Sequence, residues 1–429
     1  AITTSSAPQT VTTTAATRSA AATSAPAASA PAAAATTVSF VGWDDQTTLN
    51  LMQRFFDQQF TPQYPTIKLQ VTSTAGGDFN SKVIAEIAGG SPPDIMYVQD
   101  YMAADWVQQN VLTDLSTMAN SEKNSPVAAN WPQAIQFFQI QGKLYGLPKD
   151  LSSMVIYYNK DLLQGNGVTP PDNTGWTWDA FLQACHKLSK TGANGQQWGF
   201  TLRTFSDSGF GPWIWQNGGD FFADPKQPTQ FTLDQAAAVD ALQWYADLRN
   251  KEQVAPTTAQ MKGQGDMFAK GQVAMQQNWS SAMVGLRTSV KSFTWDVAPM
   301  PRQKQDAISM SVVALGITRT SKQQTAAWEA IKFYNGPTGS QFTLQSGWGI
   351  PPDKSVASSA AFLKDTPPQN KQVFLDQLQY ARLWPETFLW PQQRSLIITA
   401  LNPVWEGTKD AHTAITTVKP QVLAVKAAQ

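Results

Sequence analysis

The sequence is poor in the residues that most often hold metals, form disulfides or act as nucleophiles. Its 429 residues include one cysteine, Cys185, and two histidines, His186 and His412. A single cysteine cannot form a disulfide within the chain. The two histidines lie far apart in sequence, so a site built from histidine and cysteine is not expected either. We therefore expect no disulfide and no metal site.

An excess of charge of one sign is also lacking. The 31 Lys and Arg residues balance 31 Asp and Glu residues, and only 14% of the chain is charged. Nucleic acids and anionic membranes attract proteins through a basic face, so we expect no nucleic-acid partner. No apolar run approaches the ~18 residues of a membrane-spanning helix.

Several sequence motifs of catalysis and cofactor binding are absent. The chain has no GxGxxG before a helix, no GxxxxGK[ST], no HExxH, no CxxC and no GxSxG. These motifs serve dinucleotides, nucleotide phosphates, zinc, redox thiols and acyl transfer. Their absence predicts a protein without catalytic residues and without a cofactor.

Residues 1–37 differ in composition from the rest of the chain. They are almost wholly Ala, Thr, Ser and Pro, and their only charged residue is Arg18. Such a segment cannot build a core, and we interpret it as a disordered, extended tether. A tether suggests an anchor immediately upstream, outside the cytoplasmic membrane. The alternative is a low-complexity tail without that role.

From Val38 onward, segments typical of strands alternate with segments typical of helices. The stretch "TIKLQVTS" alternates apolar and polar residues as a half-buried strand does. Residues 234–250 have the apolar stripe of a helix, with Asp234 placed to cap it. The helix after Thr177 places Cys185 on its buried side, which favours a core residue over a nucleophile. The alternation predicts an α/β fold with largely parallel sheets, and the length predicts two domains.

Large polar or aromatic residues follow several of the predicted strands. Ligands of α/β proteins bind beyond the carboxyl ends of the strands. Trp43, Asp100, Trp279 and Trp348 are all expected just past a strand end. Trp279 is the clearest case, because it stands among Gln, Asn and Ser after the apolar run Val-Ala-Met. These positions predict a ligand site rich in aromatic rings and carboxylates.

A series of stretches, in order, resembles one family. They are "IAGGSPPDIMYV", "GKLYGLPKDLSSMVIYYNKDLL", "GWTWDAFLQACHKL", "WIWQNGGDFF", "FAKGQVAM" followed by a Trp, "WDVAPMPR" and "SGWGIPP". Together they resemble the carbohydrate-type extracellular solute-binding proteins of bacterial ABC importers, the relatives of maltose-binding protein. The resemblance runs from about Val38 to the C-terminus.

The resemblance implies a two-lobed fold like that of periplasmic binding proteins. Each lobe is expected to be a mostly parallel sheet flanked by helices, and the chain is expected to cross the hinge three times. The crossings are expected near Asp150, at 295–302 and at 347–354. Lobe one would then comprise 38–149 and 300–349, and lobe two 150–299 and 350–429.

The implied function is that of a transport receptor and not of an enzyme. The protein is expected to bind a mono- or oligosaccharide between the lobes and to deliver it to ABC permease subunits in the cytoplasmic membrane. Members with such linkers are lipoproteins held by a lipidated cysteine, which would lie upstream of this chain. We therefore expect a monomer at the cell surface or in the periplasm.

The chemistry of a sugar agrees with the candidate residues. A tryptophan ring matches the C–H face of a pyranose, and carboxylates accept hydrogen bonds from its hydroxyls. The expected ligand-binding residues are Trp43, Asp44, Asp100, Asp150, Trp215, Trp279, Trp348, Arg382 and Trp390.

Alternative interpretations remain for some of these candidates. Asp44 or its neighbour could instead cap the following helix, and so could Asp100. Asp150 could form a salt bridge at the hinge. Trp213 and Trp215 face opposite ways if the segment is extended, and Arg394 could take the place of Arg382.

Three other functions remain open. A carbohydrate-active hydrolase would need two carboxylates flanking the scissile bond, and the sequence does not give the separations between its aspartates. A ferric-ion binder on the same fold could use the adjacent Tyr157 and Tyr158. No residue excludes a peptide or opine binder.

Overall fold

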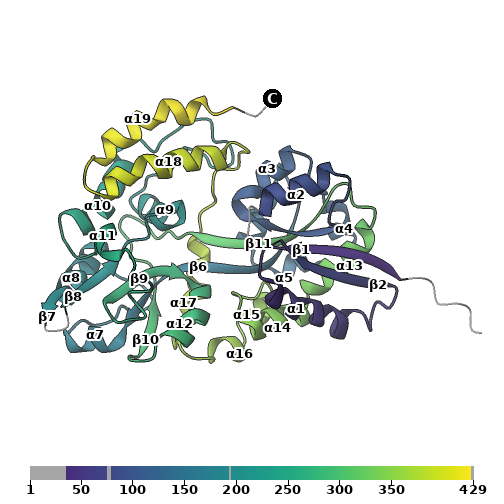
Figure 1. Cartoon of the computed structure of the whole chain (residues 1–429), viewed down its shortest axis with the longest axis horizontal. Coiled ribbons are helices and arrows are strands. Elements are labelled where there is room, and N and C mark those ends of the chain that lie inside the picture. Colours follow the sequence, from purple (N-terminus) through teal and green to yellow (C-terminus); the bar gives the residue numbers. More distant parts are fainter. Residues whose placement is uncertain (1–34, 75–78, 193–194, 427–429) are drawn as a thin grey trace, which may run out of the picture. The chain divides into compact units, whose positions relative to one another are not determined.

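The structure is a computed structural model that describes residues 35–74, 79–192 and 195–426. Among these residues nine strands join in one sheet, in the order β2-β1-β3-β11-β6-β9-β8-β7, with β10 paired beside β6 (Figure 1). The strands are β1 (Thr36–Gly42), β2 (Ile67–Ser73), β3 (Ile95–Gln99), β6 (Leu147–Asn159), β7 (Lys190–Gly192), β8 (Gly195–Thr201), β9 (Val273–Trp279), β10 (Trp295–Ala298) and β11 (Met310–Ile317). A separate hairpin consists of β4 (Gln139–Ile140) and β5 (Lys143–Leu144).

Strand β2 has the alternating pattern expected from its sequence. Ile67, Leu69 and Val71 are buried, while the residues between them are exposed. Side chains along a strand point to opposite faces, so one face of β2 packs on the core and the other meets solvent. The prediction of a half-buried strand is confirmed.

Strand β6 joins the two parts of the sheet. It is 13 residues long and buried throughout. Its first part pairs with β11 as far as Ser153, and from Met154 onward it pairs with β9 and then also with β10. The burial of every side chain follows from this position, because a central strand is covered on both faces.

The sheet is mixed. The pairs β1–β2, β1–β3 and β8–β9 are parallel, whereas β11 and β6 run antiparallel to their neighbours. The α/β class is confirmed, but the expectation of mostly parallel sheets is corrected. The reason lies in β6 and β11, which connect the two parallel parts: β11 runs antiparallel to β3 on one side, β6 runs antiparallel to β9 on the other, and the two are antiparallel to each other.

The first strand begins earlier than the predicted boundary. Strand β1 starts at Thr36, whose backbone N–H donates to the Thr66 carbonyl at 2.8 Å. The tether predicted over 1–37 therefore runs two residues too far, because Thr36 and Thr37 pair with Ile67 and Lys68. The remainder of that prediction falls on residues 1–34, which lie outside the described residues.

Helices flank the sheet along the whole described chain. Those before β6 are α1 (Gln46–Phe55), the π-helical turn η1 (Phe56–Phe60), α2 (Phe79–Ala88), η2 (Asp100–Met102), α3 (Ala103–Gln108), α4 (Ser116–Ser121), α5 (Pro126–Ala129) and α6 (Pro132–Gln136). Those between β6 and β11 are α7 (Lys160–Gly165), α8 (Trp178–Leu188), α9 (Asp207–Gln216), α10 (Ala236–Asn250), α11 (Thr258–Met261), η3 (Ser280–Ala282) and α12 (Met283–Ser289). Those after β11 are α13 (Gln324–Tyr334), α14 (Pro337–Ser346), α15 (Lys354–Ala357), α16 (Ala360–Leu363), α17 (Gln372–Asp376), η4 (Gln377–Tyr380), α18 (Trp390–Trp405) and α19 (Ala411–Ala424).

The helices predicted after Thr177 and over residues 234–250 form close to those positions. The hydroxyl of Thr177 accepts the Ala180 N–H and caps α8, and Cys185 is fully buried on the inner face of that helix. Burial raises the pKa of the Cys185 thiol well above its ordinary value, as expected of a core residue. Helix α10 starts after Gln235, and Asp234 forms an ion pair with Lys419 instead of the predicted cap.

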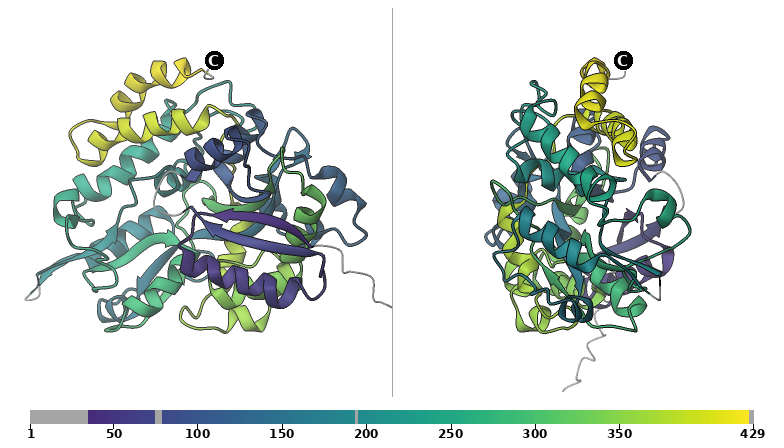
Figure 2. Two further views of the ribbon diagram at one scale, coloured as in Figure 1. Left: turned by 45° about the vertical axis from the view of Figure 1, so that its right-hand side comes forward. Right: turned by 90° about the vertical axis from the view of Figure 1, so that its left-hand side faces the viewer.

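The last two helices contact a helix from the middle of the sequence. Helices α18 and α19 pack side by side and against α10 (Figures 1 and 2). Helix α18 also contacts η2, which follows β3. This contact places the first half of α18, which includes Arg394, near the carboxyl end of β3. No helix of the described segments combines the length and the apolarity that crossing a membrane requires.

Candidate functional site

A cavity of about 200 Å³ lies at the carboxyl ends of β3, β8 and β9. Its walls come from segments on both sides of β6 in the sequence. The lining residues are Gln99, Asp100, Tyr101, Arg203, Phe205, Ser206, Asp207, Ser208, Trp279, Met310, Ser311, Trp384 and Arg394. Two of the nine predicted residues, Asp100 and Trp279, therefore line one cavity at the predicted edge of the sheet.

Trp279 is the last residue of β9. It pairs with Met154 of β6, and its carbonyl accepts a hydrogen bond from the Tyr157 hydroxyl at 3.0 Å. The strand is buried from Val273 to Gln277, but Asn278 and Trp279 are only half-buried. The backbone is thus fixed by the sheet while the indole ring stands in the cavity wall. The position of this tryptophan after the apolar run follows from its place at the strand end.

Asp100 follows β3 directly and is buried. Its carboxylate accepts the backbone N–H of Val312 at 2.8 Å and that of Tyr101 at 2.6 Å. Burial raises the pKa of the Asp100 carboxyl to about 6, with a further contribution from the charge of Asp207, while the hydrogen bonds act in the opposite direction. Asp100 therefore anchors β11 to β3 and also presents a carboxylate to the cavity.

An ion pair forms another wall of the cavity. Arg394 of α18 donates from Nε to the Asp207 carboxylate at 2.6 Å, and its guanidinium lies 4.8 Å from the centre of the Tyr101 ring. Arg394 thus occupies the position expected of Arg382. Arg382 instead pairs with Asp220 at 3.1 Å and is not among the residues that line this cavity, so its contact with a ligand stays a prediction.

Arg203 and Phe205 follow β8 and were not foreseen. The Arg203 guanidinium lies 4.5 Å from the centre of the Phe205 ring and 5.9 Å from that of Trp279. Its Nη1 donates to the side-chain oxygen of Asn278 at 3.3 Å. Burial lowers the pKa of Arg203 from its ordinary value. The rule that selected Trp279, a large side chain just after a buried apolar strand, does not select these two residues, because β8 is buried only at Gly199 and Phe200.

A second cluster gathers four predicted residues near the end of β1. The Tyr97 hydroxyl donates to Asp44 at 3.1 Å, and the rings of Trp43 and Tyr97 meet edge to face at 4.9 Å. The Lys149 ammonium lies 4.9 Å from the centre of the Tyr97 ring and 4.6 Å from that of Trp348.

The contacts of Asp150, Asp44 and Asp45 bear on the alternative interpretations of these aspartates as a salt-bridge partner and as a helix cap. Lys149 forms an ion pair with Asp150, as the alternative interpretation of Asp150 held. Burial raises the pKa of the Asp150 carboxyl. Asp45 caps α1 by accepting the Thr48 N–H, which leaves Asp44 to the Tyr97 hydroxyl. Trp348 follows helix α14 and not a strand, so its predicted local context is corrected.

Two predicted tryptophans lie in the core. Trp215 is fully buried in α9, and its indole N–H donates to Asp220 at 2.9 Å. Because the segment is helical, the alternative based on an extended chain does not apply, and Trp213 is fully buried as well. Trp390 is also fully buried, against Phe221. The expectation of ligand contact is corrected for both Trp215 and Trp390, because neither presents a surface to a ligand in this conformation.

Trp384 is the aromatic residue of this region that lines the cavity. Its ring lies 5.1 Å from that of Trp215, which packs behind it. In the sequence Trp384 and Trp390 occur in one stretch, "ARLWPETFLW", and residue type does not distinguish them. Both rings are buried in the structure, Trp390 completely and Trp384 with 6% of its surface exposed, and of the two it is Trp384 that lines the cavity.

The ferric-ion alternative finds no support in the geometry. The Tyr157 hydroxyl donates to the carbonyls of Trp279 and Ser280, and burial raises the Tyr157 pKa. The described segments contain no cluster of three or more His, Cys, Asp or Glu residues placed to hold a metal.

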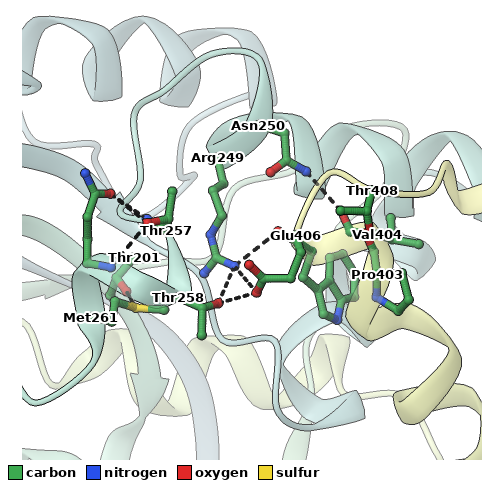
Figure 3. Close-up of polar contacts among 12 residues, drawn as sticks. Thr201, Arg249, Asn250, Thr257, Thr258, Met261, Pro403, Val404, Glu406 and Thr408 are labelled. Atoms are coloured by element: carbon green, nitrogen blue, oxygen red, sulfur yellow. Dashed lines mark hydrogen bonds and ion pairs between the residues drawn. The ribbon is translucent and has the colours of Figure 1, made fainter.

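A network away from the cavity fixes the far end of α18. Arg249 of α10 is buried, and its Nη1 donates to the Trp405 carbonyl and to the Thr258 hydroxyl, both at 3.2 Å (Figure 3). Asn250 donates to the Val404 carbonyl at 2.9 Å. These bonds satisfy carbonyls of the last turn of α18, which have no partner within the helix. They hold the helix whose first half carries Arg394.

Comparison with known proteins identifies relatives over much of the chain. Residues 44–341 match the family model described as bacterial extracellular solute-binding protein. A lactose-binding protein of Rhizobium radiobacter is 25% identical over 53% of this chain and 54% of its own length. An arabinooligosaccharide-binding protein of Bacillus subtilis is 26% identical over 46% of this chain and 44% of its own length. The chain thus spans about half the length of these two relatives.

A solved structure extends the likeness over nearly the whole fold. It is an ABC substrate-binding protein of Listeria monocytogenes in complex with cycloalternan, with a TM-score of 0.80 and 25% identity. The match covers 90% of this chain and 98% of that chain. From the mixed sheet, the matched residues and this structural likeness, we conclude that the chain belongs to the bacterial extracellular solute-binding protein family.

Proposed function

We propose that this protein is the sugar receptor of an ABC importer and that it binds a mono- or oligosaccharide in the cavity beside Trp279. The half-buried Trp279 ring, which lines the same cavity as Asp100 and the Arg394–Asp207 pair, carries this proposal. The ring face provides apolar contact for a pyranose, and the charged groups provide strong hydrogen bonds to its hydroxyls. The relatives named for binding lactose, arabinooligosaccharide and cycloalternan support the same ligand class.

The two lobes and the hinge belong to this proposal. Residues 38–149 and 300–349 would form one lobe, and 150–299 and 350–429 the other. The exchange of β6 partners between Ser153 and Met154 supports a first crossing close to Asp150. Movement of the lobes about the crossings would close the cavity over the sugar. The protein would act as a monomer, tethered through residues 1–34 to an upstream lipid anchor, and would pass the sugar to permease subunits.

The second cluster would extend the binding surface. Trp43, Trp348 and Asp44 combine aromatic faces with a carboxylate, and Asp150 adds an acceptor that Lys149 holds in place. A longer oligosaccharide could contact both this cluster and the cavity beside Trp279. In this proposal the hydroxyl acceptors are Asp44, Asp100 and Asp150.

Thermal unfolding with a panel of neutral and acidic mono- and oligosaccharides tests the proposal. A ligand present at ~100 times its Kd should raise the free energy of unfolding by ~2.7 kcal/mol. The sugar should be recovered unchanged after long incubation. Shorter products would indicate a hydrolase instead, and a panel without any stabilising sugar would contradict the proposal.

A further inference from the structure

Arg203 differs from the other cations near the site in having no acidic partner. Arg394 pairs with Asp207, Arg382 with Asp220 and Lys149 with Asp150. Arg203 forms no ion pair with any residue that the structure describes. The pairing of the other cations leaves Arg203 as the unneutralised cation of the cavity wall.

The hydrogen-bonding capacity of Arg203 is also largely unused. A guanidinium offers five N–H donors. Nη1 donates to Asn278, Nε is buried without a hydrogen-bond partner, and Nη2 donates to no described residue. A partly buried charge without a counter-charge is costly, because the protein interior solvates it poorly. A ligand that carries a negative charge would remove this cost on binding.

The surroundings keep the guanidinium in one place. Its carbon lies 4.5 Å from the Phe205 ring centre, within the range of cation–π contact. Asn278, which accepts from Nη1, is the neighbour of Trp279 on β9. The guanidinium carbon also lies 5.9 Å from the centre of the Trp279 ring, so a sugar unit beside Trp279 would lie next to the Arg203 guanidinium.

The cavity continues past Arg203. An adjoining cavity of about 300 Å³ shares the wall formed by Arg203 and Phe205 with the cavity beside Trp279. Asp266 is at its exposed side and accepts the backbone N–H of Ala269. Arg203 thus stands between two spaces and can contact a ligand unit in either of them.

We propose that the bound sugar is acidic, with a uronic-acid carboxylate, and that Arg203 determines this specificity by pairing with that carboxylate. The inference rests on the proposed function and adds the charge of the ligand to it. The two oxygens of a carboxylate match the parallel N–H donors of a guanidinium, which a neutral hydroxyl cannot do. The carboxylate at C6 lies at the edge of the pyranose and leaves a C–H face free for Trp279.

Calorimetric titration with matched pairs of ligands tests the proposal. The probes are di- and trisaccharides of galacturonate, glucuronate and mannuronate, each compared with its methyl ester, which has nearly the same shape without the charge. We expect at least one acid to bind about tenfold more tightly than its ester at low ionic strength. Its affinity should fall with added salt, while the affinity of the ester should change little.

Variants of Arg203 assign the preference to this residue. Arg203→Gln should reduce the preference for the acid to less than about threefold, and Arg203→Lys should restore part of it because the charge remains. Arg319→Gln is the matched control, since it removes an exposed arginine whose Nε donates to the Asn110 carbonyl. It should leave the preference unchanged. If Arg203→Gln unfolds at a lower temperature than the wild type, two other measurements decide the outcome. They are the salt dependence of acid binding by the wild type and the preference of Arg203→Lys for the acid over its ester.

The outcomes separate this inference from the proposed function. An ester or a neutral sugar that binds as tightly as its acid overturns the inference and leaves the sugar receptor intact. A preference for the acid that persists in Arg203→Gln overturns the role of Arg203. Failure of both acidic and neutral series to bind contradicts the receptor proposal and the inference together.

Discussion

At the residue scale, the two tryptophans Trp279 and Trp213 have opposite roles. Trp213 is fully buried in α9 and donates from its indole N–H to Gln277 at 2.9 Å, whereas Trp279 is half-buried in the cavity wall. Removing a core ring leaves a void, while removing a ring from a solvent-filled cavity removes mainly a ligand contact.

We expect Trp279→Ala to weaken sugar binding by roughly 1.5–4 kcal/mol with little loss of stability in the free protein. The carbonyl that accepts from Tyr157 belongs to the backbone and is retained. Trp213→Ala is the contrasting variant and should cost about 3–5 kcal/mol of folding free energy. Calorimetric titration and denaturant unfolding measure the two effects. Early melting of Trp279→Ala with normal sugar binding would instead mark Trp279 as a core residue.

Asp100 predicts a pH dependence of stability at the same scale. Burial raises the pKa of its carboxyl from 3.8 to about 6. Between these values the folded protein binds the additional proton, so stability falls as the pH rises. The contribution is complete below the unfolded pKa and is lost as the pH rises through about 6. Two pKa units limit it to roughly 3 kcal/mol.

The comparison with Asp100→Asn isolates this contribution, because the other acidic groups are the same in both proteins. Denaturant unfolding should show the stability of the wild type falling relative to the variant between about pH 4 and about pH 7. A difference that stays constant over this interval would show that Asp100 keeps an ordinary pKa in the folded protein.

At the scale of elements, the close packing of α9 shapes the cavity. A Cβ on Gly209 would lie 1.8 Å from the Arg203 carbonyl oxygen, and Gln277 of β9 donates to the Gly209 carbonyl at 2.8 Å. The first turn of α9 thus packs directly on the backbone that carries Arg203. Only glycine permits this approach without movement of the loop.

Gly209→Ala should therefore cost about 1–3 kcal/mol of stability and weaken sugar binding, because the Arg203 backbone must shift. Gly285→Ala in α12 is the matched control, since a Cβ there meets no atom within 4 Å. Alanine is the better helix former, so Gly285→Ala should be neutral or stabilising by up to about 1 kcal/mol. Equal effects of the two substitutions in denaturant unfolding would contradict the packing of α9.

At the scale of the whole molecule, the boundary of the folded part can be tested by truncation. Residues 35–429 form one compact unit, and β1 begins at Thr36. The composition of residues 1–34 lacks the apolar side chains of a core. We expect a chain lacking residues 1–34 to keep its melting temperature and sugar affinity.

Removal of residues 35–37 in addition should lower the melting temperature. A chain lacking residues 1–37 loses Thr36 and Thr37 from β1 and with them the pairing to Ile67 and Lys68, so it should melt earlier. Scanning calorimetry of the two truncated chains provides the comparison. Equal melting temperatures of the two truncated chains would place the boundary at residue 37, as the sequence suggested. A lower melting temperature of the chain lacking residues 1–34 than of the full chain would show that residues 1–34 pack on the fold.

The sequence by itself determined the features that depend on local pattern. Alternation in "TIKLQVTS" predicted β2, the stripe around Cys185 predicted α8, and polar or aromatic residues after strands predicted Asp100 and Trp279 as cavity residues. The ordered stretches indicated the family. These inferences succeed because strand and helix periodicities are written in neighbouring residues.

Only the tertiary structure decided which residues of the same type face the cavity. Trp215 and Trp390 are fully buried, whereas Trp384 keeps 6% of its surface exposed and lines the cavity, and Arg394 takes the position expected of Arg382. These choices depend on where α9 and α18 begin and on which distant elements they meet. The antiparallel placement of β6 and β11 has the same origin, since the partners of a strand are set by contacts between residues far apart in the chain. Local sequence patterns do not specify those contacts.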